Sequence, residues 1–140
     1  MNLNFNIEGG DFTRAGHASS EVKKVLKQLG VGAKCIKSIV IALYEAEVNV
    51  VAHAYEGKIE VDIEDDKIET KITDKGPGIP DIDMAMKEGF STASKEVRDM
   101  GFGAGMGLPN IRRNTNDFKI ESTVGQGTTL KMTNFFNESS

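Results

Sequence analysis

The sequence predicts an α+β fold: a two-layer α/β sandwich in which a mixed, mostly antiparallel sheet of about five strands has helices on one face. Two helical patterns lie early in the chain and most of the strand-like alternation follows them, an order that favours this class. The 140 residues, 39% of them apolar and 27% charged, are typical of a folded globular chain. No repeat or low-complexity linker divides the sequence, so we expect residues 1–140 to form a single domain.

The first part of the chain contains one strand-like segment and two helical ones. Polar and apolar residues alternate over residues 4–8, which predicts a short strand. Apolar residues recur at helical spacing between Phe12 and Leu29, and the glycines that follow predict the end of this helix. A second and longer helix is predicted from about Lys34 to Ala54.

The rest of the chain is richer in strands and in glycine. It predicts, in order, a hairpin with an acidic turn, two loops interrupted by Gly and Pro with a short helix after the second, and two final strands. The ranges are 58–64 and 67–73 for the hairpin, 74–81 and 89–109 for the loops, about 110–116 for the helix, and 118–123 and 128–135 for the last strands.

Composition excludes several classes of function. A net charge of −4 without a basic stripe is not that of a nucleic-acid-binding protein. The one cysteine, Cys35, cannot form an internal disulfide and is expected to be structural. The sequence contains no apolar run near about 18 residues and no secretion signal at its start, so we expect a cytoplasmic protein without a membrane span.

The long helix carries polar residues in a mostly apolar surface. Glu45 and Asn49 lie four residues apart, so their side chains are neighbours on one side of the helix. An ordinary solvated face would explain this pair. Because the helix is apolar nearly all round, a functional pair is the sharper hypothesis: Glu45 suits a general base, and the Asn49 oxygen suits Mg²⁺.

Glu47 lies in the middle of the apolar arc of the same helix, where an unpaired carboxylate is costly. Either the helix is rotated from the expected orientation or Glu47 has a basic partner. The sequence leaves both alternatives open.

Two glycine-rich segments are candidate ligand-binding loops. Asp74 follows a predicted strand and precedes Gly76 and Gly78, an arrangement that fits either an ordinary strand-end turn or a loop lying close to a ligand. The second segment, residues 101–107, has glycine at alternate positions before a short helix expected to begin with Pro109, which favours a phosphate site over a flexible linker. The polar stretch 89–100 between them is predicted to be a lid.

Four motifs in order resemble the GHKL superfamily, the ATP-binding domain shared by gyrase, Hsp90, histidine kinases and MutL. They are Glu45-x3-Asn49, Asp74-x-Gly76-x-Gly78, Gly103-x-Gly105-x-Gly107 and Gly127-Thr128-Thr129. Within that superfamily, the stretch from Tyr44 to Tyr55 is similar to the long-helix motif of the small bacterial anti-sigma-factor and switch serine/threonine kinases. The resemblance covers nearly the whole chain and implies the Bergerat fold.

The resemblance also implies roles for individual residues. Asn49 would hold Mg²⁺ against the phosphates of ATP, Asp74 would bind the adenine amino group, and Glu45 would orient or deprotonate the attacking hydroxyl. The nucleotide-binding set is completed by residues near the base and by glycines that would wrap the phosphates. These residues are Gly76, Gly78, Ile79 and Thr128 near the base, and Gly101, Gly103, Gly105 and Gly107 at the phosphates. The lid cation that would meet the γ-phosphate is either Arg98 or Lys95.

The resemblance therefore implies an ATP- and Mg²⁺-dependent protein serine/threonine kinase that phosphorylates a small STAS-domain regulator in a bacterial partner-switching pathway. One alternative is an ATP-dependent module that binds a sigma factor and has little kinase activity. Another is a detached histidine-kinase catalytic domain, although His17 is followed by Ala18 rather than by an acidic residue and is expected to lie at the surface. Related kinases dimerise, and the first strand and helix are the candidate surface for a homodimer, but the sequence leaves the oligomeric state open.

Overall fold

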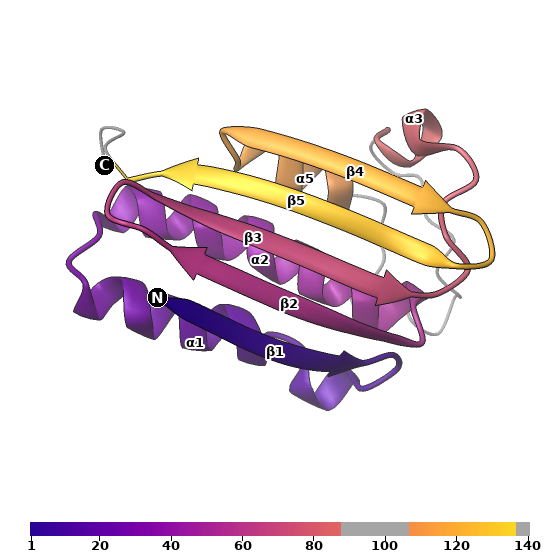
Figure 1. Ribbon diagram of the computed structural model, residues 1–140, viewed down its shortest axis with the longest axis horizontal. Coiled ribbons are helices and arrows are strands. Elements are labelled where there is room, and N and C mark those ends of the chain that lie inside the picture. Colours follow the sequence, from indigo (N-terminus) through magenta and orange to yellow (C-terminus); the bar gives the residue numbers. More distant parts are fainter. Residues whose placement is uncertain (88–106, 137–140) are drawn as a thin grey trace.

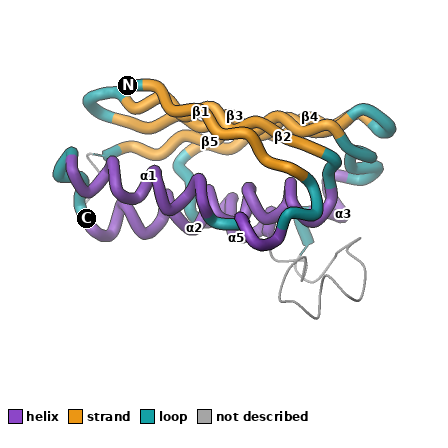
Figure 2. The backbone as a smooth tube through the Cα atoms, turned by 90° about the horizontal axis from the view of Figure 1, so that it is seen from below, coloured by secondary structure: helices purple, strands orange, loops and turns teal. Residues whose placement is uncertain are grey.

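The computed structural model describes residues 1–87 and 107–136. Among these residues, five strands form one sheet, and the helices lie against one of its faces (Figures 1 and 2). The strands are β1 (Asn2–Glu8), β2 (Glu56–Ile63), β3 (Lys67–Lys75), β4 (Asp117–Thr123) and β5 (Gly127–Phe135). The helices are a 3₁₀ turn (Phe12–Arg14), α1 (His17–Gln28), α2 (Ala33–His53), α3 (Ile82–Ala85) and α5 (Gly107–Arg113).

The sheet has the strand order β1-β2-β3-β5-β4, and each neighbouring pair in it is antiparallel. The prediction of a two-layer α+β sandwich with helices on one face is thus confirmed. The expected mixed character of the sheet was wrong, because no parallel pair occurs among the strands described. Within the described ranges, no helix is both long and apolar enough to span a bilayer.

The core lies between α2 and the helix-facing side of the sheet. Alternate residues of β2 and β3 are buried, as strand geometry requires, and they face the apolar side of α2. The largest fully buried side chains come from α1, α2, β2, β3 and α5; they are Leu26, Ile39, Leu43, Ile59, Ile68, Ile111, Val22, Val50 and Val61. Each contributes about 1.5–3 kcal/mol by leaving water, so this core holds α2 firmly against the sheet.

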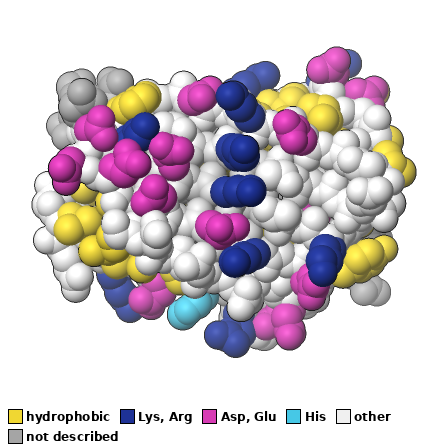
Figure 3. All heavy atoms as spheres, viewed as in Figure 1, with side chains coloured by type: hydrophobic (Ala, Val, Ile, Leu, Met, Phe, Trp, Pro, Cys, Tyr) yellow, Lys and Arg dark blue, Asp and Glu magenta, His cyan; other side chains and the backbone are white. Residues whose placement is uncertain are grey.

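The opposite face of the sheet is not covered by any described helix, and it is polar. Figure 3 shows Lys and Arg side chains in a column across the middle of this face, beside a group of acidic ones. In the strand register, exposed Lys71 lies opposite Lys131, which in turn lies opposite Lys119. These side chains belong to the alternate residues of each strand that point away from the core.

The boundaries of several elements differ from those predicted. The first long helix begins at His17 rather than Phe12, because Gly16 has a left-handed backbone (φ 95°) that separates α1 from the preceding 3₁₀ turn. Strand β3 continues to Lys75, so Asp74 lies in the strand rather than in the loop. Helix α5 begins at Gly107, ahead of the start predicted at Pro109 or Asn110.

The short helix α3 was not predicted. Asp81 caps it, because the Oδ1 atom of this residue accepts a hydrogen bond from the backbone N–H of Met84 at 3.0 Å. An aspartate just before a short helix is a recognisable start signal.

Candidate functional site

The end of β3 holds the first part of the site. Asp74 is paired with Thr128 of β5 in the register, and its Oδ1 atom accepts a hydrogen bond from the Thr128 backbone N–H at 3.1 Å. The side chain is partly buried. Burial raises the pKa of Asp74, and the hydrogen bond from Thr128 acts in the opposite direction. An ionised Asp74 in this position can accept a hydrogen bond from an amino group.

A small hydroxyl cluster fixes the loop that follows Asp74. The Ser122 hydroxyl accepts a hydrogen bond from the Ile79 backbone N–H at 2.7 Å, and the Ser122 and Thr128 hydroxyl oxygens lie 2.8 Å apart. The loop is therefore attached to the ends of both β4 and β5. Sequence reasoning missed Ser122, since a serine in a strand gives no signal of a partner 43 residues away.

The two glycines after Asp74 lie in tight contacts with their neighbours. Gly78 has φ +77°, and a Cβ atom there would lie 2.5 Å from the carbonyl oxygen of Thr123. A Cβ atom at Gly76 would lie 3.0 Å from the Cα of Ala54, just beyond the end of α2, and 3.4 Å from the Asp74 Oδ1 atom. Both glycines thus bring the loop close to its neighbours and beside the Asp74 carboxylate.

The polar pair on α2 forms the second part of the site. Glu45 and Asn49 are both half-buried, in a helix whose neighbouring positions are mostly buried and apolar. Helix α5 packs on this side of α2. A Cβ atom at Gly107, the first residue of α5, would lie 2.8 Å from the Oδ1 atom of Asn49, so only glycine leaves that amide its present position.

Glu45 has a neighbour that the sequence did not reveal. The Asn110 side chain on α5 lies beside Glu45. Burial raises the pKa of Glu45, and hydrogen bonding to the neighbouring Asn110 lowers it by a smaller amount. An asparagine on a short helix 65 positions further along the chain carries no sequence signal of this contact.

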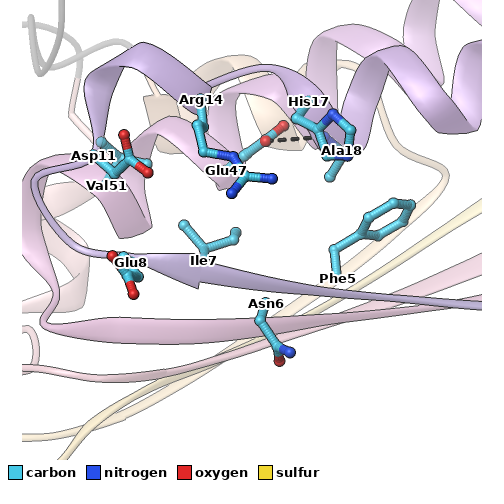
Figure 4. A pocket seen from close by; sticks show the side chains of 10 residues that line it. All are labelled: Phe5, Asn6, Ile7, Glu8, Asp11, Arg14, His17, Ala18, Glu47 and Val51. Atoms are coloured by element: carbon cyan, nitrogen blue, oxygen red, sulfur yellow. Dashed lines mark hydrogen bonds between the residues drawn. The ribbon is translucent and has the colours of Figure 1, made fainter.

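Glu47 points away from the Glu45–Asn49 pair and is 2% exposed. One carboxylate oxygen accepts a hydrogen bond from the backbone N–H of Ala18 at 3.0 Å (Figure 4). The other accepts one from the backbone N–H of Ser19 at 3.2 Å. Within the described part of the chain, neither predicted alternative is correct. The apolar arc of α2 faces the core as expected, so the helix is not rotated, and the partners that these bonds provide are amides of the first turn of α1 rather than a basic side chain.

A cavity of about 230 Å³ lies beside Glu47, between β1 and the start of α1 (Figure 4). Its lining combines apolar, acidic and basic side chains: Phe5, Asn6, Ile7, Glu8, Asp11, Arg14, His17, Ala18, Glu47 and Val51. None of the predicted nucleotide-site residues that the structure describes lines it. His17 is exposed and makes an edge-on contact with the Phe5 ring, as expected of a surface histidine.

The structure brings the predicted site residues into two groups. The group at the end of β3 contains Asp74, Gly76, Gly78, Ile79 and Thr128. The group between α2 and α5 contains Glu45, Asn49 and Gly107. Three predicted glycines and both candidate lid cations lie outside the described residues; they are Gly101, Gly103, Gly105, Lys95 and Arg98.

An antiparallel five-stranded sheet, a long helix carrying a Glu-x3-Asn pair and a glycine turn after a strand-end aspartate together define the GHKL class of ATPase domain. Comparison with known families agrees. The chain belongs to the histidine kinase-like ATPase domain family, whose pattern matches residues 11–134.

Two relatives indicate which members of this family the chain is similar to. The chain is 35% identical over 123 residues to an anti-sigma F factor of Caldanaerobacter subterraneus subsp. tengcongensis, a match that covers 84% of this chain and 82% of the relative. It is 33% identical over 113 residues to the serine/threonine-protein kinase RsbT of Bacillus subtilis, covering 78% of this chain and 79% of the relative.

Two solved structures share the fold. A crystal structure of RsbU and RsbW domains from Mycobacterium tuberculosis matches 96% of this chain and 32% of that chain, with a TM-score of 0.65 and 16% identity. The mycobacterial sensor histidine kinase MprB matches 96% of this chain and 97% of that chain, with a TM-score of 0.55 and 16% identity. At this identity the likeness concerns the fold alone.

Proposed function

We propose that this protein is an ATP- and Mg²⁺-dependent protein serine/threonine kinase that phosphorylates a small STAS-domain regulator in a bacterial partner-switching pathway. The observation that carries the proposal is the pair of half-buried polar side chains on α2, Glu45 and Asn49, facing the glycine that begins α5. The relatives named as an anti-sigma F factor and a serine/threonine kinase support the same pathway.

In this proposal, the adenine base lies at the end of β3. The Asp74 carboxylate accepts a hydrogen bond from the adenine amino group, and Thr128 supports base recognition through water. The loop of Gly76, Gly78 and Ile79 passes the base, held in place by the bond from the Ile79 N–H to Ser122. The phosphates extend toward α2 and the glycine segment that ends at Gly107.

The residues present fit a Mg²⁺ ion bound with the nucleotide. Mg²⁺ prefers hard oxygen ligands and is commonly held by one or two protein side chains together with phosphates and water. Asn49 supplies one such oxygen, and the missing Cβ of Gly107 leaves space at that oxygen. The ion would neutralise charge on the phosphates, which is the main requirement of phosphoryl transfer.

Glu45 acts as the general base in this proposal. Its carboxylate takes the proton of the substrate hydroxyl as that oxygen bonds to the γ-phosphorus and the bond from phosphorus to ADP breaks. Burial raises the pKa of Glu45, which makes the carboxylate a stronger base than an exposed glutamate. Partial burial beside α5 also keeps bulk water from competing for this oxygen.

The direct test is incubation with ATP, Mg²⁺ and a purified STAS-domain protein encoded beside this chain. We expect phosphoserine or phosphothreonine on the STAS protein. Glu45→Gln should lower transfer by at least about a hundredfold while the variant still binds ATP, and Asn49→Ala should lose affinity for Mg²⁺-ATP. Glu21→Gln, on the exposed side of α1, is the matched control. Absence of any phosphoprotein, or undiminished transfer by Glu45→Gln, would contradict the proposal.

The second candidate function is ATP-dependent sequestration of a sigma factor, favoured by the relative named as an anti-sigma F factor. Capture of a purified sigma factor in the presence and absence of nucleotide tests it. Both activities can reside in one protein. Size measurement of the purified chain tests the accompanying proposal of a homodimer.

A further inference from the structure

Three strands end in a row of polar side chains on the face of the sheet that carries the helices. Residues directly opposite one another in the register form rows across β3, β5 and β4, and residues two positions apart in a strand share a face. An apolar row contains Ile72, Leu130 and Ile120. The next row on the same face contains Asp74, Thr128 and Ser122.

The Ser122 hydroxyl in this row has three hydrogen-bonding neighbours. It accepts a bond from the Ile79 backbone N–H at 2.7 Å and donates one to the Gly127 carbonyl oxygen at 3.1 Å. Its oxygen also lies 2.8 Å from the hydroxyl oxygen of Thr128. A serine hydroxyl has one hydrogen and two lone pairs. Because the hydrogen goes to the carbonyl oxygen, the Thr128 hydroxyl must be the donor in the contact with Ser122.

This assignment leaves Thr128 with acceptor capacity only. Its single hydroxyl hydrogen points to Ser122, so the remaining lone pairs are what it offers to a bound group. The neighbouring Asp74, when ionised, also offers only acceptors, and its Oδ1 atom already accepts the Thr128 backbone N–H at 3.1 Å. An amino group can donate a hydrogen to this pair of side chains, whereas a keto oxygen in the same place would face acceptors alone.

Ser122 is not the only attachment of the loop that follows Asp74. The Gly76 backbone N–H donates to the Gln126 carbonyl oxygen at 3.2 Å, and the Gly125 backbone N–H donates to the Pro77 carbonyl oxygen at 2.9 Å. These two bonds join the loop to the turn between β4 and β5 and involve no side chain. The direction of the Thr128 hydroxyl, by contrast, depends on the Ser122 side chain.

We propose that Ser122 is a positioning residue that sets base selectivity: it turns the Thr128 hydrogen away from the base, so that the site accepts an aminopurine and rejects a ketopurine. This inference rests on the nucleotide site of the proposed function. Ser122 acts through Thr128 and does not itself contact the base. Asp74 supplies the rest of the selectivity.

The test compares the affinities of two nucleotides by calorimetry in the presence of Mg²⁺. Inosine diphosphate carries a keto oxygen where ADP carries the amino group. We expect wild type to prefer ADP by at least about a hundredfold and Ser122→Ala to reduce this preference by roughly tenfold. In the variant the Thr128 hydrogen is free to donate to the keto oxygen, directly or through water. A merely structural role of Ser122 would weaken both nucleotides alike and leave the ratio of their affinities unchanged.

Three further variants identify the route of the effect. Ser122→Thr keeps a hydroxyl and should retain the wild-type ratio. In a Thr128→Val background, Ser122→Ala should not change the ratio further, because the hydroxyl through which Ser122 acts is absent. Glu121→Gln, an exposed change on the opposite face of β4, is the control and should leave both affinities unchanged.

A further readout needs no nucleotide. In Ser122→Ala the Ile79 amide hydrogen loses its acceptor and should exchange with solvent faster than in wild type, and an unchanged rate would overturn the assigned bonds.

The outcomes distinguish this inference from the kinase proposal. An unchanged ratio in Ser122→Ala, or an equal change of ratio in the wild-type and Thr128→Val backgrounds, would overturn the role of Ser122. A protein that shows the expected ratios but phosphorylates no STAS protein would contradict the kinase proposal and support the role of Ser122. A wild type that binds neither nucleotide would overturn both.

Discussion

Replacement of Glu47 tests the most unusual contact in this fold. The N-terminus of α1 has no cap from its own N-cap residue, which is Gly16, and the Glu47 carboxylate from α2 takes that place. In Glu47→Gln one oxygen remains as an acceptor, and the new NH₂ group faces an N–H that then has no acceptor. The negative charge of Glu47, which interacts favourably with the positive N-terminal end of the α1 dipole, is also lost.

The expected loss follows from the two bonds. Leaving one buried N–H without a partner costs about 1–3 kcal/mol, and loss of a charge at a buried helix terminus adds up to about 2 kcal/mol. We therefore expect Glu47→Gln to lower the free energy of unfolding by about 2–4 kcal/mol, which is a large part of the 5–15 kcal/mol typical of a domain. For a chain of this size the melting temperature should fall by roughly 7–14 °C.

Thermal and urea unfolding in the absence of nucleotide measure this loss, with Glu21→Gln as control. Glu21 also lies on α1, but it makes only an exposed ion pair with Lys24 at 3.4 Å, so its loss should stay within about 0.5 kcal/mol. Faster amide exchange at Ala18 and Ser19 should accompany the change at Glu47. Equal stability of the Glu47→Gln and Glu21→Gln variants would refute the reasoning.

Three further predictions concern the candidate site. Gly107→Ala should leave the melting temperature nearly unchanged, because the new Cβ would meet only the movable amide end of the Asn49 side chain. The variant should bind Mg²⁺-ATP at least about tenfold more weakly, because that Cβ displaces the Asn49 amide. Calorimetry that finds unchanged affinity would contradict this. Gly78→Ala should lower stability more than Gly125→Ala. Both glycines have positive φ, but of the two only a Cβ at Gly78 would meet a backbone atom, the Thr123 oxygen. Equal melting temperatures for the two variants would count against the packing argument. Asp74→Asn should lose ATP affinity while the nucleotide-free protein is as stable as wild type or more so at pH 7. Burial raises the pKa of Asp74 in the folded state. Wild type should therefore gain stability relative to Asp74→Asn as the pH falls through that raised pKa, and the gain is complete below the unfolded pKa of about 3.9. A stability advantage of wild type that instead grows with rising pH would contradict this direction.

Much of the fold could be predicted from local pattern. Alternation located β2, β3, β4 and β5, and the apolar arc of α2 correctly assigned its core-facing side. The start of α1 was missed because the apolar pattern continues through the 3₁₀ turn, and only the left-handed backbone of Gly16 separates the two. Periodicity does not report such a break.

The candidate site could be proposed from the sequence where its residues form a local motif, and its contacts with distant residues could not. Asp74, Gly78 and the Glu45–Asn49 pair are recognisable because their spacing is local. Asn110 and Ser122 lie beside residues that are far away in the chain, and nothing in their own sequence neighbourhood reveals these contacts. The partner of Glu47 was missed for a related reason: backbone amides carry no sequence signature, so only basic side chains were considered.

The placement of Glu45 and Glu47 on different sides of α2 restricts how this protein can change during evolution. Inserting or deleting one residue within the middle of α2 would turn everything beyond it by about 100°, which would disturb the proposed base and the attachment of α1 together. Length variation is therefore expected to accumulate in the turns between strands, while the middle of this helix keeps its length across related genes.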